Sequence, residues 1–466
     1  MGKIINSDVT DNSLEFKKFR EKYNELHYKS FSLSEDNENI NISFDFEITG
    51  LCSFNPKIKM AKKNFKLKNI NSNLAKNMVF NIGMIELISY WKSACPKNIY
   101  IDCMSLTDEQ IAWWKKLYFL GLGELRYRNN IKVSEDEFLN IKCTTDKFLE
   151  NEKDVSKYEG YIIPIGGGKD SCVTLETLNL DTNRDYTLII NPKPTTLECA
   201  KLAGFNDDHI IEIKRILDKK IIDLNAKGFI NGHTPFSAML AFVSYFVSYL
   251  LGRKYISLSN ENSANEANIN GEKINHQYSK SIEFENDFEL YTKKYLNTGT
   301  KYFSFLRPLN ELQIAKIFST LKKYHPVFKS CNVGSKSTPW VWCCNCAKCL
   351  FAFTILSPYL YKKELVDIFG EDLFEKESLL EIFKELTGNS DHKPFDCVGT
   401  FEEVNFAVTK TIENLEEKGE KLPYLLQYYK DDCKMSDTSD DITKRYNENN
   451  NLTDEQNKLL KAKLFE

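Results

Sequence analysis

The residues most able to do chemistry form one short run: Gly166, Gly167, Gly168, Lys169, Asp170 and Ser171. Consecutive glycines let a backbone approach an anion closely, and the amides of a following helix's first turn point at that anion. Lys169 would add a positive charge and Ser171 a hydroxyl donor, while Asp170 would hold a Mg²⁺ ion that bridges phosphate oxygens. The run therefore predicts a site for a pyrophosphate-sized anion, with Lys169 and Asp170 as catalytic groups. The alternative is a glycine-rich turn with a capping Ser or Asp.

A second pattern is a group of cysteines. The chain has 13 cysteines. Cys343, Cys346 and Cys349 are each separated by two residues, which suits tetrahedral Zn²⁺, with Cys331 as the fourth ligand or Cys344 in its place. The polar N-terminal residues predict no secretory signal, so we expect a cytoplasmic, reducing environment in which clustered cysteines more often bind metal. A structural zinc is therefore predicted, the other interpretation being a reduced cluster buried without metal.

The elements that must position these groups form an α/β pattern from about residue 156 onward. Apolar strands at 161–165, 186–190, 209–213 and 255–259 are separated by segments of helix length, which predicts a doubly wound parallel sheet covered on both faces. The glycine run follows the first of these strands. Asn191 ends the second, and Asn260 and Glu261 follow the fourth, at the edge where open parallel sheets bind nucleotides. We expect Asn191 to contact the nucleotide and Asn260 and Glu261 the substrate, unless these loops are only polar caps.

An α+β domain precedes this sheet. Ile40, Ile42, Phe44, Phe46 and Ile48 alternate with polar residues, which places all five on one face of a half-exposed strand. A helix is expected over 84–95, a strand over 98–103, and a further helix after the capping box that starts at residue 107. The predicted division is an N-terminal domain at 1–150, a catalytic domain at 151–405, and a helical, partly disordered tail at 406–466, because residues 431–451 are too polar to bury much surface.

Composition excludes several classes of protein. The 62 basic and 66 acidic residues give a net charge of −4, which argues against a nucleic-acid binder. The uncharged run at 236–252 approaches the length of a membrane span, but it follows Pro235 and carries Ser237, Ser244 and Ser248 on one helical stripe. We therefore expect a buried helix of a soluble protein without nucleic-acid or membrane partners. The sequence leaves the oligomeric state open.

The glycine run resembles the Ser-Gly-Gly-x-Asp-Ser loop of the PP-loop ATP pyrophosphatases, with Gly166 in place of the usual serine. It lacks the Gly-Lys-Ser/Thr ending of a Walker A loop. The resemblance implies a sheet of PP-loop (HUP) type and cleavage of ATP between its α and β phosphates, with AMP transferred and pyrophosphate released. Similar Cys-x₂-Cys-x₂-Cys runs occur in PP-loop enzymes that make deazaguanine bases, where the zinc is structural.

Further stretches resemble the MurL family of ATP-dependent UDP-N-acetylmuramoyl-L-alanyl-L-glutamate epimerases. They are residues 83–92, 113–118, 121–124, 263–266, 275–281, 307–309, 393–399 and 402–403, together with the glycine run and the cysteines. The resemblance covers about residues 40–405. It implies that ATP and Mg²⁺ activate the terminal glutamate carboxylate of a UDP-sugar dipeptide, and that the α-carbon of this glutamate is then inverted.

The groups that move the proton are less defined. Inversion through a planar carbanion needs two groups on opposite faces or one mobile group. His276, His392, Lys393 and Cys397 are the candidates, with Glu261 and Glu403 behind them, and each has a structural role as its alternative. Lys280, Arg307 and Lys393 are candidates to bind the anionic substrate, or else salt-bridge partners. Other functions stay open, namely an amide- or sulfur-forming PP-loop enzyme, an epimerase of a different peptide, and a nucleotide sensor without turnover.

Overall fold

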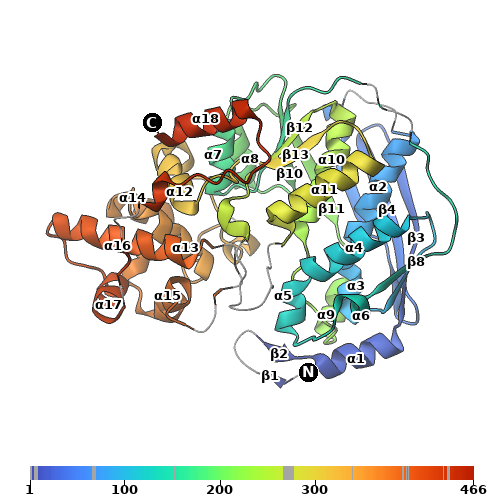
Figure 1. The fold of residues 1–466 in the computed structure, drawn as a ribbon, viewed down its shortest axis with the longest axis horizontal. Coiled ribbons are helices and arrows are strands. Elements are labelled where there is room, and N and C mark those ends of the chain that lie inside the picture. Colours follow the sequence, from blue (N-terminus) through green and yellow to red (C-terminus); the bar gives the residue numbers. More distant parts are fainter. Residues whose placement is uncertain are drawn as a thin grey trace.

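One mixed sheet of eleven strands forms the centre of the protein (Figure 1). The computed structural model describes residues 3–4, 9–65, 70–151, 154, 156–265, 278–337, 340–390, 393–394, 396, 398–433, 435–437 and 441–465. The strand order is β13-β12-β9-β10-β11-β6-β4-β3-β7-β8, with β5 beside β4. The strands are β3 (Glu25–Glu35), β4 (Asn39–Ile48), β5 (Cys52–Phe54), β6 (Lys57–Ala61), β7 (Asn98–Ile101), β8 (Asn140–Cys143), β9 (Tyr161–Pro164), β10 (Tyr186–Ile190), β11 (Ile210–Ile216), β12 (Tyr255–Leu258) and β13 (Lys301–Ser304). A separate pair, β1 (Lys3–Ile4) and β2 (Thr10–Asp11), lies near the N-terminus.

The five strands from β13 to β11 are parallel, as the alternation of strands and helices predicts. Helices cover both faces of this part. Ile162 of β9 packs into the core that includes α10 (Phe236–Leu251), while its neighbour Ile163 packs with Leu175 of α7 (Lys169–Thr177) and Ala200 of α8 (Pro194–Leu202). Because neighbouring residues of a strand point to opposite faces, both faces must be apolar, which explains the continuous apolar strands.

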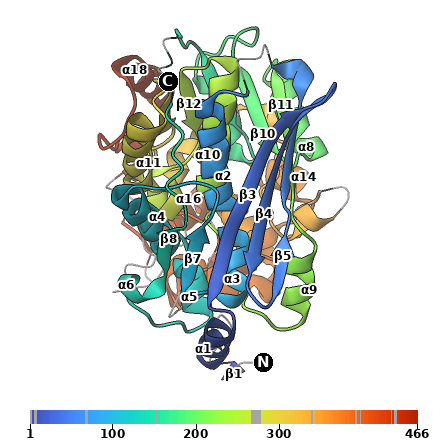
Figure 2. The same ribbon diagram turned by 90° about the vertical axis from the view of Figure 1, so that its right-hand side faces the viewer.

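The N-terminal part of the sheet has one covered face. Every second residue of β4 is buried, which confirms the alternation predicted for this strand. The helices α2 (Asn73–Glu86) and α3 (Ile88–Ala94) cover it (Figure 2). One helix over 84–95 was expected. Instead α2 begins at its Ser72 cap, and the helical run is interrupted at Leu87.

The two parts of the sheet are joined by an antiparallel pair, β6 with β11. A buried ion pair lies at this junction, because Arg215 of β11 donates to Glu86 of α2 at 2.7 Å and to Ser89 at 2.8 Å. The sheet is thus continuous across residue 150, and the division predicted there stays a prediction. The remaining helices of this region are α1 (Ser13–Lys22), α4 (Asp108–Gly121), α5 (Gly123–Arg128), α6 (Glu135–Phe138), α9 (Lys220–Ala226) and α11 (Ile282–Tyr295); α4 begins with the predicted capping box.

A largely helical region with its own apolar core follows β13. It comprises α12 (Glu311–Thr320), α13 (Ala347–Leu356), α14 (Lys362–Phe369), α15 (Leu380–Thr387), α16 (Phe401–Glu417), α17 (Tyr424–Asp432) and α18 (Asp454–Phe465). The C-terminal segment was expected to bury little. Within residues 431–451, Ile442 is buried. The helix α18 that follows lies against α7 and α12 and buries Leu460 and Leu464.

The long apolar helix α10 ends at Gly252, whose left-handed backbone (φ 65°) closes it. Ser244 and Ser248 are fully buried in it, and Ser248 donates to the carbonyl of Arg253 at 2.5 Å. Within the described ranges, no helix is long and apolar enough to cross a membrane.

Candidate active site

The glycine run lies at the carboxyl edge of the parallel strands, between β9 and α7. Gly167 has a left-handed backbone (φ 78°), and a Cβ there would lie 2.9 Å from Thr196 Cγ2, so glycine is required. A Cβ at Gly166 would meet nothing within 4 Å. Among the described residues, none of the backbone amides from Gly166 to Ser171 donates to a protein acceptor. The loop therefore presents open amides at a helix N-terminus, which is the arrangement that binds anions.

Lys169 is the first residue of α7, and its side chain is buried. Its ammonium donates to the carboxylates of Asp170 and Glu311. Burial alone would lower the pKa of Lys169, but the two carboxylates outweigh burial and hold this pKa above its ordinary value. Lys169 is therefore charged and fixed beside the loop. Asp170 is about one third exposed, and Ser171 Oγ donates to the carbonyl of Gly168 at 2.9 Å.

Carboxylates outnumber cations around Lys169. Burial first, and then the carboxylates of Asp170, Glu261 and Glu403, raise the pKa of Glu311 to about 8, against the opposing effect of Lys169. Glu403 is also buried, and burial raises its pKa as well. An excess of buried carboxylates beside open amides marks a candidate functional site. Glu311 was not a predicted site residue, because nothing in its local sequence distinguishes it from an ordinary first helical residue.

Glu403 joins two helices at this point. It occupies the third position of α16 and caps that helix, and one of its oxygens accepts the backbone amide of Glu311 at 2.7 Å. Gly399 lies between them, because a Cβ there would be 2.8 Å from Glu403 Oε2 and 3.2 Å from Glu311 Cγ. The segment leading into α16 therefore reaches the carboxylate partner of Lys169.

The predicted proton-transfer residues His276, His392 and Cys397 lie outside the described residues. Cys397 precedes Gly399 by two positions along the chain, so its segment is the one that reaches Glu311. Lys393 is buried, with its ammonium 5.4 Å from the ring centroid of Phe401. These roles stay predictions.

The two other predicted loops lie at the same edge of the sheet. Asn191 is exposed, and its side-chain oxygen accepts the amide of Arg215 at 2.9 Å, so in this structure it ties the end of β10 to β11. Asn260 donates to Ser304 Oγ at 3.0 Å. Glu261 is buried, accepts from Ser263 Oγ at 3.2 Å, and is close enough to Glu311 to affect its pKa. Of these three residues, Glu261 is the one whose side chain acts on Glu311, the carboxylate partner of Lys169.

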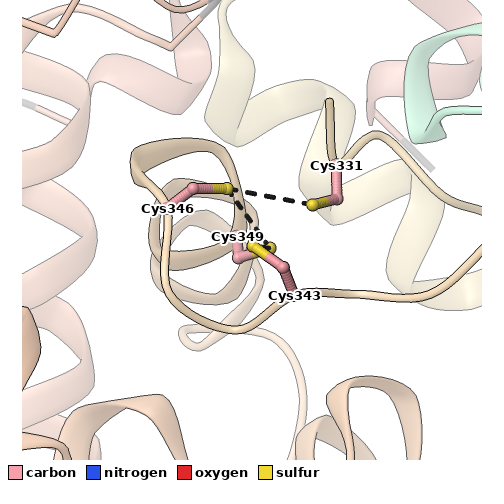
Figure 3. Close-up of side chains that lie close together, drawn as sticks. All are labelled: Cys331, Cys343, Cys346 and Cys349. Carbon is pink, nitrogen blue, oxygen red and sulfur yellow. Dashed lines mark hydrogen bonds between the residues drawn. The ribbon is translucent and has the colours of Figure 1, made fainter. Parts of the chain in front are cut away.

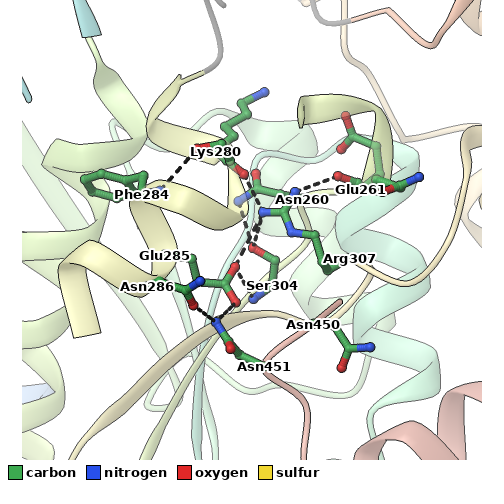
Figure 4. A network of polar contacts seen from close by, with 12 residues as sticks. Asn260, Glu261, Lys280, Phe284, Glu285, Asn286, Ser304, Arg307, Asn450 and Asn451 are labelled. Atoms are coloured by element: carbon green, nitrogen blue, oxygen red, sulfur yellow. Dashed lines mark hydrogen bonds and ion pairs between the residues drawn. The ribbon is translucent and has the colours of Figure 1, made fainter. Parts of the chain in front are cut away.

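Arg307, a predicted substrate-binding residue, is fully buried. Figure 4 shows the network of polar contacts around its guanidinium. Nη1 donates to the carbonyl of Glu261 at 2.8 Å, and Nη2 donates to the carbonyl of Lys280 and pairs with Glu285 at 3.4 Å. The backbone of Lys280 is thus an acceptor in this network, in the short 3₁₀ helix Tyr278–Lys280. The guanidinium therefore holds the loop after β12 in place, and through it the carboxylate of Glu261.

The predicted cysteines come together from two segments (Figure 3). The sulfurs of Cys331, Cys343, Cys346 and Cys349 all lie within 4.8 Å of one another. Cys344 does not join them, because its thiol donates to the carbonyl of Phe369 at 3.2 Å. The spacing alone had left Cys331 and Cys344 as alternatives for the fourth ligand. Of these two residues, Cys331 is the one that lies with Cys343, Cys346 and Cys349.

The fold and the loop define a class, namely a mixed α/β protein with a glycine-rich helix N-terminus at the carboxyl edge of its parallel strands. Within that class, residues 17–305 match the MurL N-terminal domain and residues 327–439 match the MurL C-terminal domain. The chain belongs to the MurL family, as the sequence motifs indicate. The first matched region ends just after β13, and the second begins at residue 327.

Three relatives share the printed name UDP-N-acetyl-alpha-D-muramoyl-L-alanyl-L-glutamate epimerase. The protein of Xanthomonas oryzae pv. oryzae is 31% identical over 361 residues, which cover 76% of this chain and 78% of the relative. That of Micromonospora sp. is 31% identical, over 71% of this chain and 74% of the relative. That of Salinispora tropica is 32% identical, over 69% and 70%. No solved structure was found to match the chain.

Proposed function

We propose that this protein epimerises the terminal glutamate of UDP-N-acetylmuramoyl-L-alanyl-L-glutamate, in an ATP-dependent reaction that releases AMP and pyrophosphate. The observation that carries the epimerase assignment is the match to relatives of that name over more than two thirds of both chains. The substrate is a small, anionic peptide precursor of peptidoglycan. We expect the reaction to take place in the cytoplasm.

The chemistry explains why ATP is needed. Removing a proton α to a carboxylate would place negative charge on carbon beside an existing anion. When the carboxylate oxygen attacks the α phosphate of ATP, an O–P bond forms, pyrophosphate leaves, and the acyl adenylate no longer carries the carboxylate charge. A base then takes the α proton, an acid returns a proton to the opposite face, and water cleaves the acyl adenylate to the D-glutamyl product and AMP.

The glycine loop supports ATP use. Its amides from Gly166 to Ser171 have no described protein acceptor, and those of Lys169 to Ser171 form the positive end of α7. In this proposal the amides bind the phosphates that leave as pyrophosphate, and Lys169 balances their charge. Glu311 holds the ammonium of Lys169 in place, so it is a positioning residue.

Asp170 fits a magnesium ligand of the kind that shares its ion with phosphate oxygens. It is partly exposed beside the loop, and Mg²⁺ in such sites takes only one or two protein carboxylates. Among the described residues, no three carboxylates come as close together as the four cysteines do, so a closed protein cage for the ion is not formed. When bound, Mg²⁺ would neutralise charge that develops on the phosphates.

The proton-transfer step is assigned to the segment around Gly399. This glycine lies against Glu311 and Glu403, and Cys397 is two positions before it in the sequence, which supports this segment as the source of the base. Cys397, His276 and His392 remain the candidates for base and acid. A thiol that acts as the base would make α-proton exchange depend on Cys397 more strongly than pyrophosphate release does.

The test is incubation of the protein with ATP, Mg²⁺ and the UDP-linked dipeptide in D₂O, with pyrophosphate and deuterium at the glutamate α-carbon both followed. We expect deuterium incorporation that requires ATP. Cys397→Ser should slow deuterium incorporation more than pyrophosphate release, and equal slowing of both steps would contradict its role as the base.

Other outcomes distinguish the remaining functions. Pyrophosphate release without deuterium would overturn the epimerase assignment and favour an amide- or sulfur-forming reaction. ATP binding without either product would favour a sensor. Deuterium incorporation in the absence of ATP would overturn the adenylation step while leaving the epimerase assignment.

A further inference from the structure

The four-cysteine cluster has the dimensions of a metal site. The Sγ atoms of Cys331 and Cys346 are 3.9 Å apart, those of Cys343 and Cys349 are 3.8 Å apart, and those of Cys346 and Cys349 are 3.6 Å apart (Figure 3). Four thiolates around Zn²⁺ at about 2.3 Å form a tetrahedron with an edge of about 3.8 Å. A disulfide would bring two of the sulfurs to about 2.0 Å. The spacing therefore fits coordination of one ion and excludes a disulfide in this structure.

The local backbone builds this geometry. Cys346 is the N-cap of α13, Cys349 lies in the first turn of that helix, and Cys344 has a left-handed backbone (φ 55°) that turns the chain between Cys343 and Cys346. The amide of Gly334 donates to the sulfur of Cys331 at 3.1 Å, which is the contact that orients a metal-bound thiolate. Residue 334 must be glycine, because a Cβ there would lie 1.8 Å from the carbonyl oxygen of Val341.

The cluster is linked directly to the glycine loop. The amide of Lys329, two residues before Cys331, donates to the carbonyl of Gly167 at 2.8 Å. Ser330 Cβ would lie 3.6 Å from a Cβ placed at Gly168. On the other side, Asn332 donates to Asp396 at 3.2 Å, in the segment that leads to Gly399. The residues around Cys331 thus lie between the two segments that carry the proposed chemistry.

We propose that Cys331, Cys343, Cys346 and Cys349 bind one structural Zn²⁺, and that this ion holds Lys329 and Ser330 against the glycine loop. By linking Cys331 to α13, the ion would fix the backbone of Lys329 and Ser330. The amide of Lys329 donates to the carbonyl of Gly167 and so supports the left-handed conformation of this glycine. The zinc assignment is independent of the epimerase assignment. Its effect on nucleotide binding rests on the proposed phosphate-binding role of the loop.

Metal content tests the site itself. Full-length protein, purified with zinc present and then freed of loose metal, should contain about one zinc per chain by mass spectrometry. Cys346→Ser and Cys331→Ser should lose most of it, whereas the matched variant Cys344→Ala should keep it. Protein in which Co²⁺ replaces zinc should show the intense visible absorption of a tetrahedral thiolate site. Absence of metal, or equal metal in Cys344→Ala and Cys346→Ser, would overturn the assignment.

The effect on the loop is measured on the wild-type chain, so that it does not depend on a variant that fails to fold. Zinc is removed with a chelator and then restored, while pyrophosphate binding is measured by calorimetry and amide exchange of the peptide containing Lys329 by mass spectrometry. We expect removal to speed this exchange and to weaken pyrophosphate binding about tenfold, a common size for coupling between two sites. Restoring zinc should reverse both changes.

The outcomes separate the two proposals. If zinc is bound but its removal changes neither exchange nor pyrophosphate affinity, the bracing role is overturned. If exchange at Lys329 changes while pyrophosphate never binds, even to the zinc-loaded protein, the phosphate-loop assignment fails and the metal site stands.

Discussion

Two buried cations, Lys169 and Arg307, lie at the same edge of the sheet and have opposite surroundings. Arg307 pairs with one buried carboxylate, that of Glu285, and its terminal nitrogens donate to backbone carbonyls. Glu285 in turn accepts from the amide of Ser304 and from Asn451. The charges are balanced and almost all donors are used, which is typical of a structural ion pair.

The surroundings of Lys169 are unbalanced. Asp170 and Glu311 contact its ammonium, and Glu261 and Glu403 add further negative charge nearby. Open backbone amides lie beside this group. A buried cation by itself therefore does not mark a functional site. The site is where charge and hydrogen-bonding groups remain uncompensated by the protein, and Glu261 connects the two networks, through its carbonyl to Arg307 and its carboxylate to Glu311.

The largest expected effect comes from removing the unbalanced cation. Lys169→Gln should slow pyrophosphate release by about 10³-fold, the upper end of the effect of losing one group that stabilises charge in a transition state. The matched control is Lys201→Gln, because Lys201 is an exposed lysine of α8 that pairs with exposed Asp207. Release at a normal rate in Lys169→Gln would contradict the functional role of the Lys169 cluster.

Substitution of Arg307, whose charge is balanced by Glu285, should lower the stability of the folded protein. Arg307→Lys keeps the charge but cannot reach both carbonyls, so buried acceptors lose their donor, and the free energy of unfolding should fall by about 2–4 kcal/mol. Urea unfolding measures this loss. Arg445→Lys is the comparison, because Arg445 and Glu402 form a half-exposed pair for which about 0–1 kcal/mol is typical. A raised KM for the dipeptide with unchanged stability would instead support the predicted substrate contact.

The pH dependence of stability should reveal the uncompensated carboxylate of Glu311. Because burial raises the pKa of Glu311 to about 8, the folded protein binds its proton more tightly than the unfolded chain does. Its contribution to stability is therefore present at low pH and lost as pH rises from about 4.5 toward 8, by up to about 1.4 kcal/mol per pH unit. Glu311→Gln should lack this slope in urea unfolding between pH 5 and pH 8.

The control for this measurement is exposed Glu381. Its side chain is 80% exposed, so Glu381→Gln should keep the wild-type slope. Parallel slopes in wild type and Glu311→Gln would show that Glu311 stays ionised throughout this pH range, and would contradict the raised pKa of its carboxyl.

Sequence patterns predicted those features that depend on neighbouring residues. Sequence analysis correctly predicted the alternation in β4, the parallel strands β9 to β12 and the capping box of α4, because each depends on a period or spacing within one element. Cys343, Cys346 and Cys349 are close together in the sequence, so their grouping could be predicted as well. The exclusion of Cys344 depends on the direction of its side chain, which spacing does not define.

Features that depend on distant residues were not predicted. The junction of β6 with β11 joins segments about 150 residues apart, and strand pairing at that separation leaves no local pattern. Glu311 meets Lys169 across 142 positions. Arg307 was assigned to the substrate by residue type, although its terminal nitrogens serve the protein. Residue type proposes a charge, and only the fold determines whether that charge is already compensated.

The smallest expected effect distinguishes two neighbouring glycines of the loop. Gly166→Ser should be tolerated, because a Cβ there meets nothing within 4 Å, and the new hydroxyl can donate to a bound phosphate. One added hydrogen bond of about 0.5–1.5 kcal/mol corresponds to about 2- to 12-fold tighter pyrophosphate binding, which calorimetry can measure. Gly167→Ser should weaken binding instead, because its φ of 78° and the Cγ2 of Thr196 at 2.9 Å both oppose a side chain. Equal effects of the two substitutions would mean that the open amides do not face the phosphates, and that the uncompensated groups around Lys169 serve another ligand.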